Sequence, residues 1–507
     1  MAESGAGASP PTRETRRPRL WQALLPLVVL AALLGCSVLL FGDDSSLGAN
    51  QVALMLATIV AALVGLSNGQ RWDEIQDGMV HGIALAIVPI FILLAVGALI
   101  GTWMLAGTVP TLVVYGMQLM HPAYFYPATC LVCAIVALSI GSSWTVAGTL
   151  GIALMGVAQG LEMSPAITAG AVISGAYFGD KLSPLSDTTN LAPAAAGAEL
   201  FEHIRYMTWT TVPALVLALI GFAIVGLRAS HKLAAQDDAV FGDLPSVLAQ
   251  HFSIGPHLLI PMLVVVVLAI RRMPAYPTIL IGALSGLLFA ALFQPDAMAA
   301  LGSAEGRGRA LGMFAGGWTA MFNGYAVETG HAATDDLISR GGMASMLPTI
   351  WLIVAALGFG AVMERVGLLE RLIRSVLKAV RSSSSLIAST VATSFGTNLV
   401  AADQYMAIVL PGRLFRAEYQ RRGLAPVNLS RALEDGGTMT SALIPWNTCG
   451  AYMAATLGVA TLDYLPYVFF NLLSPLLAMA VAYSGYKILR LPASNDTPAA
   501  SAPTHTP

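Results

Sequence analysis

The stretch MVHGIALAIVPIFILLAVGALIGTWM, residues 79–104, decides the fold class because it contains no Asp, Glu, Lys or Arg. It is longer than the roughly 20 apolar residues that an α-helix needs to cross the hydrocarbon core of a bilayer. It lies within residues 78–161, which also carry none of these charged side chains. A water-facing surface cannot be built from such a segment. The stretch therefore predicts a membrane-spanning helix.

The composition extends this prediction to the whole chain of 507 residues. Hydrophobic residues make up 56% of the sequence and charged residues 11%, whereas roughly 25% of the residues in a soluble protein are charged. The net charge is −2, and no basic stripe interleaved with aromatic residues occurs, which argues against a nucleic-acid partner. We predict an all-α polytopic membrane protein with about 10–12 transmembrane helices, embedded in a lipid bilayer.

Charged residues gather between the apolar runs and indicate where each run begins and ends. The basic N-terminal tail, residues 1–19, is expected in the cytoplasm because Lys and Arg favour that side of a membrane. The apolar run that follows the tail, residues 20–41, is too long for a signal peptide and is interpreted as a retained membrane helix. Spanning helices are predicted at residues 20–41, 52–69, 79–104, 165–196, 208–227, 256–270, 276–293, 345–363, 433–458 and 465–489.

Two further apolar stretches, residues 123–160 and 386–411, have a polar centre. Non-helical backbone at membrane depth must be buried in protein or line a wet cavity. We therefore predict two re-entrant hairpins, the alternative being ordinary helices joined by loops. The expected tips are Ser142 and Thr145 in the first hairpin and Ser394 and Thr397 in the second.

The hairpins are expected to enter the membrane from opposite faces. Basic residues flank only the second one, so its loops 364–385 and 412–432 are predicted to be cytoplasmic. Each hairpin is followed by a polar interruption, which predicts two broken helices, and opposite entry is typical of inverted-topology repeats. The predicted parts are a cytoplasmic tail (1–19), a first inverted repeat (20–227), a connecting loop (228–255), a second inverted repeat (256–490) and a disordered tail (491–507).

The first interruption, FGDKLSPLSDTTNLAP at residues 178–193, concentrates polar groups inside an apolar run. Its charged residues are Asp180, Lys181 and Asp187, and each costs about 2.5–3.5 kcal/mol near the centre of a bilayer. Pro184 has no backbone N–H and frees carbonyl groups of the preceding turn. Carboxylates beside unwound backbone are how transporters hold small cations. The alternative is a polar loop in which Asp180 and Lys181 neutralise each other.

The second interruption, LEDGGTMTSALIPWNT at residues 433–448, offers two more carboxylates. Glu434 and Asp435 are either functional or simply solvated at a helix start, where the helix dipole favours negative charge. Asp403 is the single charged residue between Ser382 and Gly412. Because it lies within the second predicted hairpin, we assign it a functional role.

Four motifs together resemble the NhaC-type sodium/proton antiporter family, over about residues 20–490. They are FGDKLSPLSDTTNLAP (178–193), DDLISRGGMASM (335–346), TNLVAADQYMAIVLPGR (397–413) and EDGGTMTSALIPWNTCGAYM (434–453). The resemblance implies a multi-pass protein of the bacterial inner membrane that exchanges Na⁺ for H⁺. One departure is Ala442, where the family is expected to favour proline, so helix breaking there depends on Pro445.

The resemblance carries a set of site residues over to this sequence. Matching positions are Asp180, Ser183, Asp187, Thr188, Thr189, Asn190, Asn398, Asp403, Thr440, Ser441, Asn447 and Thr448. We expect one or more of Asp187, Asp180 and Asp403 to bind either Na⁺ or a proton, never both. Burial favours the protonated form of a carboxylate and a neighbouring cation favours the ionised form, so the two ions compete. No cofactor is expected, and no metal other than transported Na⁺.

Two other classes of function are alternatives to this one. A Na⁺- or H⁺-coupled transporter of a small organic acid of the malate or lactate type, or of an amino acid, would use the hairpin hydroxyls to bind a carboxylate. A membrane enzyme is disfavoured because no nucleophile–base or metal motif is present, so the protein is predicted not to be an enzyme. The sequence leaves substrate preference, stoichiometry and oligomeric state open, a homodimer being one option.

Overall fold

The computed structural model describes residues 16–42, 45, 48–234, 244–304, 307–326, 339 and 341–491. These residues form helices joined by short connections, and the only β-contact among them is an isolated bridge between Leu424 and Arg490. Within this part of the chain, seven helices are long and apolar enough to cross a membrane. The bent pair Thr461–Tyr467 and Phe469–Ser484 adds an eighth if it is one span. The prediction of an all-α polytopic membrane protein is confirmed.

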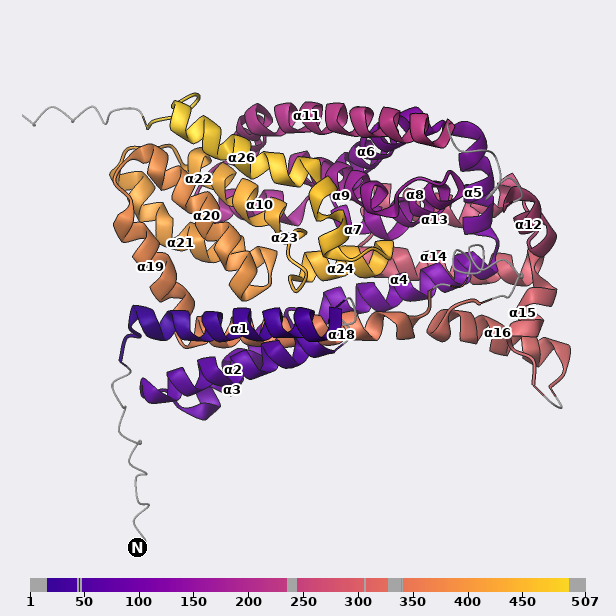
Figure 1. The fold of residues 1–507 in the computed structure, drawn as a ribbon, viewed down its shortest axis with the longest axis horizontal. Helices are drawn as coiled ribbons and strands as arrows, with labels where there is room; N and C mark the ends of the chain where they lie inside the picture. The colour runs from indigo at the N-terminus through magenta and orange to yellow at the C-terminus, as the bar shows by residue number, and fades with distance from the viewer. Residues whose placement is uncertain are drawn as a thin grey trace, which may run out of the picture.

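The helices form two layers. Of the first layer, α1, α2, α3, α16 and α18 lie lowest in Figure 1, and α4, α13 and α14 are drawn above them. In it α1 packs on α2, α18 packs on both α2 and α3, and α14 packs on α4. Its helices are α1 (Leu20–Phe41), α2 (Ala49–Ser67), α3 (Trp72–Ala84), α4 (Ile87–Leu105), α13 (Ile260–Ile270), α14 (Ala275–Phe293), α15 (Pro295–Leu301), α16 (Arg309–Asn323) and α18 (Leu347–Arg365).

The second layer lies above the first in Figure 1 and contains both helix interruptions. Here α6 packs on α9 and α11, α11 packs on α26, and α10 packs on α21 and α22. Its helices are α6 (Pro122–Ile140), α7 (Ser143–Val146), α8 (Ile152–Gly160), α9 (Pro165–Leu182), α10 (Asp187–Ala196), α11 (Leu200–Ala234), α20 (Ser383–Ala401), α21 (Gln404–Arg421), α22 (Pro426–Leu433), α23 (Met439–Ser441), α24 (Thr448–Leu457), α25 (Thr461–Tyr464) and α26 (Phe469–Ser484). Two π-helical turns, Ala147–Gly151 and Glu434–Thr438, interrupt the α-helical backbone.

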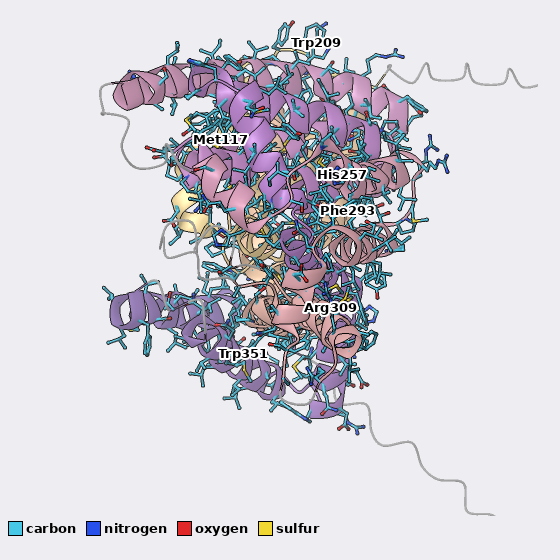
Figure 2. All side chains as sticks on the ribbon, turned by 90° about the vertical axis from the view of Figure 1, so that its right-hand side faces the viewer. Met117, Trp209, His257, Phe293, Arg309 and Trp351 are labelled. Carbon is cyan, nitrogen blue, oxygen red and sulfur yellow. The ribbon has the colours of Figure 1, made fainter. Side chains whose placement is uncertain are left out.

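Large apolar side chains point outward from both layers. Trp209 on α11 is 46% exposed and Trp351 on α18 is 44% exposed. Figure 2 shows Trp209 at the top of the molecule and Trp351 in its lower part. Broad exposed apolar surfaces of this kind mark contact with lipid. Both layers therefore present apolar side chains that are compatible with lipid contact.

The order and lengths of the helices repeat along the chain. α4 and α18 each have 19 residues, α5 (Thr108–Leu119) and α19 (Leu368–Ala379) each have 12, and α6 and α20 each have 19. Gly107 and Gly367, with φ of 79° and 78°, make the same turn before α5 and α19. The two helices that follow the interruptions, α10 and α24, each have 10 residues. This correspondence is what an internal repeat requires, and the inverted orientation of its halves remains a prediction.

The structure corrects several predicted helix limits. The span predicted at 79–104 lies within the candidate span Trp72–Leu105, in which a turn at Leu85 and Ala86 separates α3 from α4. The predicted loop 364–385 contains α19, and the predicted loop 412–432 contains the end of α21 and the start of α22. Charged residues end an apolar run without ending a helix, which is why the sequence placed these limits too early. α11 likewise continues to Ala234, and α12 (Leu244–His251) follows it.

The membrane orientation can be tested at the loop before α20. Figure 1 places the start of α1 and helix α19 at the same end of the molecule, and the Arg16 N–H donates to the Asn68 carbonyl there at 2.9 Å. Because Lys and Arg concentrate at this end, we expect it to be cytoplasmic. In a variant whose exposed Cys36 is replaced by serine, Ser383→Cys should react with an impermeant thiol reagent only after the cells are opened. His121→Cys, before α6, should react in intact cells, and labelling of position 383 in intact cells would reverse the orientation.

Candidate functional site

The two hairpins and the two broken helices of the second layer all line one cavity of about 260 Å³. Each of the four contributes residues to its wall. They are Gly141, Ser142, Ser143 and Trp144 from the first hairpin, Asp180, Ser186, Asp187 and Thr188 from the first broken helix, Asp403, Gln404 and Tyr405 from the second hairpin, and Thr448 from the second broken helix. Three carboxylates thus line a single cavity, which we call the carboxylate cavity.

The opposite wall of the carboxylate cavity is apolar and belongs to the first layer. It is formed by Leu85, Val88, Pro89 and Ile92 around the turn between α3 and α4, Ala275 at the start of α14, and Leu357 of α18. The polar groups therefore all come from the second layer. The cavity lies at the boundary between the two layers.

Asp180 is held at the tip of the first hairpin. Its Oδ2 accepts hydrogen bonds from the Ser143 N–H at 3.0 Å and the Ser143 hydroxyl at 2.6 Å. Ser143 is the first residue of α7, whose N-terminal N–H groups favour a negative charge. Gly141, with φ 75°, allows the tip to approach the broken helix closely. A Cβ at this position would lie 2.8 Å from the Leu185 carbonyl carbon. The backbone between α6 and α7 breaks at Gly141 and Ser142, and the other expected tip residue, Thr145, lies within α7.

Asp187 occupies a different environment in the same cavity. It is the first residue of α10, whose N-terminus is capped by the Ser186 hydroxyl, which accepts from the Thr189 N–H at 3.3 Å. Its side chain is exposed, and no hydrogen bond from a described residue reaches its carboxylate. Asp187 is therefore the cavity carboxylate with the greatest freedom to turn toward a small cation.

Thr189 and Asn190 use their side chains within the interruption itself. The Thr189 hydroxyl donates to the carbonyls of Asp180 at 3.1 Å and Lys181 at 3.0 Å. The Asn190 amide donates to the carbonyls of Pro184 at 2.9 Å and Ser186 at 2.7 Å. The carbonyl groups at the break therefore already have donors. Ser183 is fully buried, and its hydroxyl accepts from the Leu185 N–H at 3.3 Å.

The turn of the second hairpin lies at Ala402 and Asp403, and the prediction of a tip at Ser394 and Thr397 is wrong. Both of those residues lie inside α20, where the Thr397 hydroxyl donates to the Thr393 carbonyl at 2.8 Å. Such back-bonding lets hydroxyl residues continue a helix. The Asp403 carboxylate caps α21 by accepting from the Met406 N–H at 2.9 Å.

Asn398, Thr440 and Asn447 lie together, but outside the lining of the cavity. The Asn398 amide donates to Thr440 Oγ1 at 3.0 Å, and the Asn447 amide donates to Asn398 Oδ1 at 3.0 Å. Asn447 Oδ1 also caps α24 by accepting from the Cys449 N–H at 3.0 Å. Nearby, the Ser441 hydroxyl donates to the Thr438 carbonyl at 2.7 Å. These predicted site residues join the second hairpin to the second broken helix.

Lys181 is paired with Asp435, not with its neighbour Asp180. Both side chains are fully buried, so the interpretation of Asp435 as a solvated residue is wrong. Glu434 is fully buried as well, and neither of its carboxylate oxygens has a hydrogen-bond partner among the described residues. The basic residues that precede Glu434 and Asp435 indicated a segment exposed to water. Arg431, however, is itself buried in contact with the Tyr206 ring.

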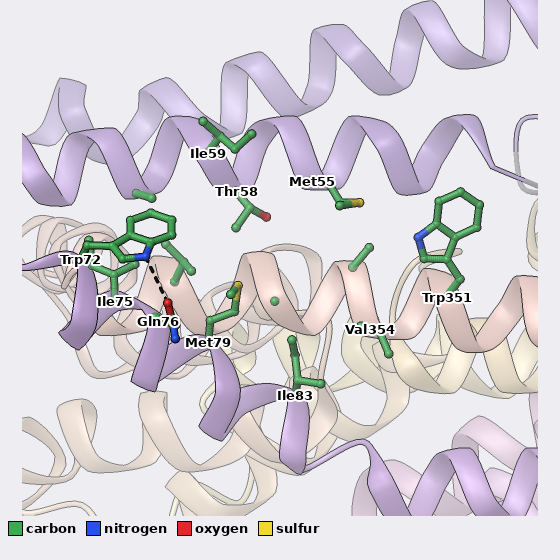
Figure 3. A pocket seen from close by; sticks show the side chains of 14 residues that line it. Met55, Thr58, Ile59, Trp72, Ile75, Gln76, Met79, Ile83, Trp351 and Val354 are labelled. Carbon is green, nitrogen blue, oxygen red and sulfur yellow. Dashed lines mark hydrogen bonds between the residues drawn. The ribbon is translucent and has the colours of Figure 1, made fainter.

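A second large cavity, of about 340 Å³, lies between α2, α3 and α18. Figure 3 shows its apolar lining, with Met55, Met79 and Trp351 among the side chains and one hydrogen bond, from Trp72 Nε1 to Gln76 Oε1 at 3.1 Å. No charged residue lines it. The carboxylate cavity is therefore the candidate ion site.

A profile of the Na⁺/H⁺ antiporter family matches residues 175–486, from α9 to the end of α26. The chain belongs to this family. Its match includes Asp180, Asp187 and Asp403 and so covers all three carboxylates of the cavity. The first hairpin, with Ser142 and Ser143, lies before the matched residues.

Curated relatives of this antiporter-family chain are similar over nearly their full length. It is 41% identical to the Na⁺/H⁺ antiporter NhaC of Alkalihalophilus pseudofirmus over 435 residues. The aligned residues are 86% of this chain and 90% of the relative. It is 35% identical to the NhaC of Bacillus subtilis, over 90% of this chain and 96% of the relative. It is also 36% identical to the malate-2H⁺/Na⁺-lactate antiporter of Bacillus subtilis, over 93% and 96%. The predicted membership of the NhaC-type family is confirmed.

Proposed function

We propose that this protein is a secondary antiporter of the bacterial inner membrane that exchanges Na⁺ for H⁺ at the carboxylate cavity. The observation that carries the proposal is the meeting of Asp180, Asp187 and Asp403 in one cavity of a membrane-spanning chain. Membership of the Na⁺/H⁺ antiporter family and the names of two relatives support the choice of ions. Na⁺ and H⁺ are then its transported substrates.

Repulsion between the carboxylates supplies a reason for exchange. Negative charges that share one cavity destabilise one another unless a proton or a cation neutralises them. A carboxylate that holds a proton cannot at the same time be the anionic ligand of Na⁺. Binding of one ion therefore displaces the other. Exchange follows if the cavity opens in turn to the two sides of the membrane.

The Na⁺ ligands are proposed to be one carboxylate and several neutral oxygens. The described residues hold no group of three or more His, Cys, Asp or Glu side chains that could bind a metal ion together. We assign the leading role to Asp187, because Asp180 and Asp403 already accept hydrogen bonds from Ser143 and Met406. The hydroxyls of Ser142, Ser186, Thr188 and Thr448 also line the cavity and are the proposed neutral ligands.

Reconstitution in proteoliposomes with an internal pH-sensitive dye tests this function. After an inside-acid pH gradient is set, external Na⁺ alone should discharge it, whereas K⁺, malate, lactate and amino acids alone should not. Liposomes without protein provide the baseline. A gradient that collapses only when an organic solute is added would contradict the proposal.

A second candidate, exchange of a small organic acid, is favoured by one feature of the cavity. The residues that begin or cap four helices, Ser143 of α7, Asp187 of α10, Asp403 before α21 and Thr448 of α24, all line it. Helix N-termini favour anions through their dipoles. The malate–lactate antiporter among the relatives agrees with this alternative. Solute-dependent discharge in the same assay would select it.

Asp403 can be neutralised without disturbing its helix cap. Asparagine is as good an N-cap as aspartate, because its amide oxygen can still accept from the Met406 N–H. We expect Asp403→Asn to unfold at the wild-type temperature but to bind Na⁺ about tenfold more weakly, since a charge has left the cavity. Thermal unfolding and the Na⁺ KM of exchange measure the two effects. An unchanged KM would restrict Asp403 to capping.

A further inference from the structure

The ion pair between Lys181 and Asp435 joins four helical segments inside the second layer. The Lys181 ammonium also donates to Ser474 Oγ at 2.8 Å, and the Ser474 hydroxyl donates to Asp435 Oδ1 at 2.7 Å. The Thr210 hydroxyl approaches Asp435 Oδ2 at 3.4 Å. These residues come from α9, the π-helical turn Glu434–Thr438, α26 and α11. The four polar groups form one fully buried hydrogen-bonded cluster.

A buried ion pair adds little to stability by itself. Removing two charges from water costs about as much as their attraction returns, and well-packed apolar residues often replace such a pair without loss. Deleting one partner is strongly destabilising because it leaves a buried charge without compensation. The presence of this pair therefore calls for a reason other than stability.

The pair lies next to the carboxylate cavity but faces away from it. Successive residues of an α-helix point about 100° apart, so Asp180 and Lys181 leave the last turn of α9 in different directions. Asp180 reaches Ser143 in the cavity wall, and Lys181 reaches Asp435. The Thr189 hydroxyl holds the backbone carbonyls of both residues. The end of α9 is thus held on both sides of the residue that carries the cavity carboxylate.

We propose that Lys181 and Asp435 are a positioning pair, which fixes the orientation of Asp180 in the carboxylate cavity and keeps the Lys181 ammonium away from it. Asp435 compensates the ammonium, so Asp180 keeps its negative charge at the cavity wall. The pair itself does not contact the transported ion. This inference rests on the proposed Na⁺/H⁺ exchange and adds two residues that the cavity lining does not contain.

The test compares Lys181→Met, Asp435→Asn and the double variant Lys181→Met/Asp435→Met. Both single variants should unfold at lower temperature than the wild type, and Asp435→Asn should also lose exchange because the freed ammonium neutralises Asp180. The double variant should recover the unfolding temperature. Its Na⁺ KM should nevertheless rise about tenfold or more, because the charge of Asp180 is no longer held in place; removal of outer residues around a metal site has effects of this size. Glu418→Gln, which breaks a pair with Arg421 and Arg422 at the end of α21, should leave KM and unfolding temperature unchanged.

Two results would overturn the positioning role. One is a stable double variant with the wild-type KM, which would make the pair purely structural. The other is a double variant that binds Na⁺ normally but moves no protons, which would make Lys181 a proton carrier. If the double variant does not fold, Asp435→Glu decides the question, because its displaced carboxylate should raise KM and shift the pH profile. A wild-type protein without Na⁺-driven proton movement would instead refute the proposed function.

Discussion

Replacing Asp187 with asparagine is expected to abolish Na⁺-dependent proton movement in proteoliposomes. An amide can neither release a proton nor neutralise a cation. The fold should persist, because the cap of α10 is the Ser186 hydroxyl and the Asp187 carboxylate accepts no hydrogen bond from the described residues. The initial rate of dye dequenching after Na⁺ addition, measured at several pH values, should fall to that of protein-free liposomes.

A conservative substitution and a matched control distinguish the loss of the Asp187 charge from damage to the fold. Asp187→Glu keeps the charge but displaces it, so some exchange should remain with a shifted pH profile. Glu202→Gln neutralises an exposed carboxylate of α11 outside the cavity lining and should exchange at the wild-type rate. Wild-type antiport in Asp187→Asn, together with its loss in Asp403→Asn, would move the competing site to the second hairpin.

Asp180 is not expected to take over from Asp187. Its Oδ2 is engaged by both the N–H and the hydroxyl of Ser143, and turning toward an ion would break these bonds. Asp187 has no such bonds to lose. Two aspartates seven residues apart in one motif therefore have different tasks, one placing a fixed negative charge at the cavity wall and the other binding the exchanged ion.

Long apolar runs and their interruptions could be predicted from the sequence because each is a local property. α1 has the predicted limits 20–41, and the first broken helix opens at Ser183–Ser186, where Pro184 removes a donor. The break in the second broken helix, residues 442–447, includes Pro445 but begins at Ala442. The interruption could therefore be predicted although position 442 is alanine and not the expected proline.

The other features of the site depend on contacts between residues far apart in the sequence, which the sequence alone does not reveal. Ser394 and Thr397 resemble a hairpin tip, but their hydroxyl groups are equally compatible with a helix interior, so the turn at Asp403 was misplaced by several residues. Asp435 lies 254 residues from Lys181 along the chain, and its proximity follows only from the packing of the two broken helices. The Gly-Ser-Ser tip of the first hairpin did contain a signal for Ser143, the donor to Asp180.

Alanine at Gly436 is expected to destabilise the protein strongly. Gly436 lies in the π-helical turn Glu434–Thr438, which packs against α20. A Cβ at this position would lie 2.6 Å from the Val391 carbonyl oxygen and 2.8 Å from Val391 Cα. These are backbone atoms and cannot rotate away, so α20 would have to move. Overpacking of this kind costs about 1–3 kcal/mol, measurable as a lower unfolding temperature in detergent.

Gly396, in α20 itself, provides the matched control, because a Cβ there would meet no atom within 4 Å. Gly396→Ala should leave stability unchanged or raise it, since alanine is favoured over glycine in a helix by about 1 kcal/mol. Displacement of α20 in Gly436→Ala would also break the hydrogen bond from Asn398 to Thr440, so the folded fraction should bind Na⁺ more weakly. Equal unfolding temperatures for the two variants would mean that the π-helical turn and α20 do not approach as closely as described, and the link between second hairpin and second broken helix would need another explanation.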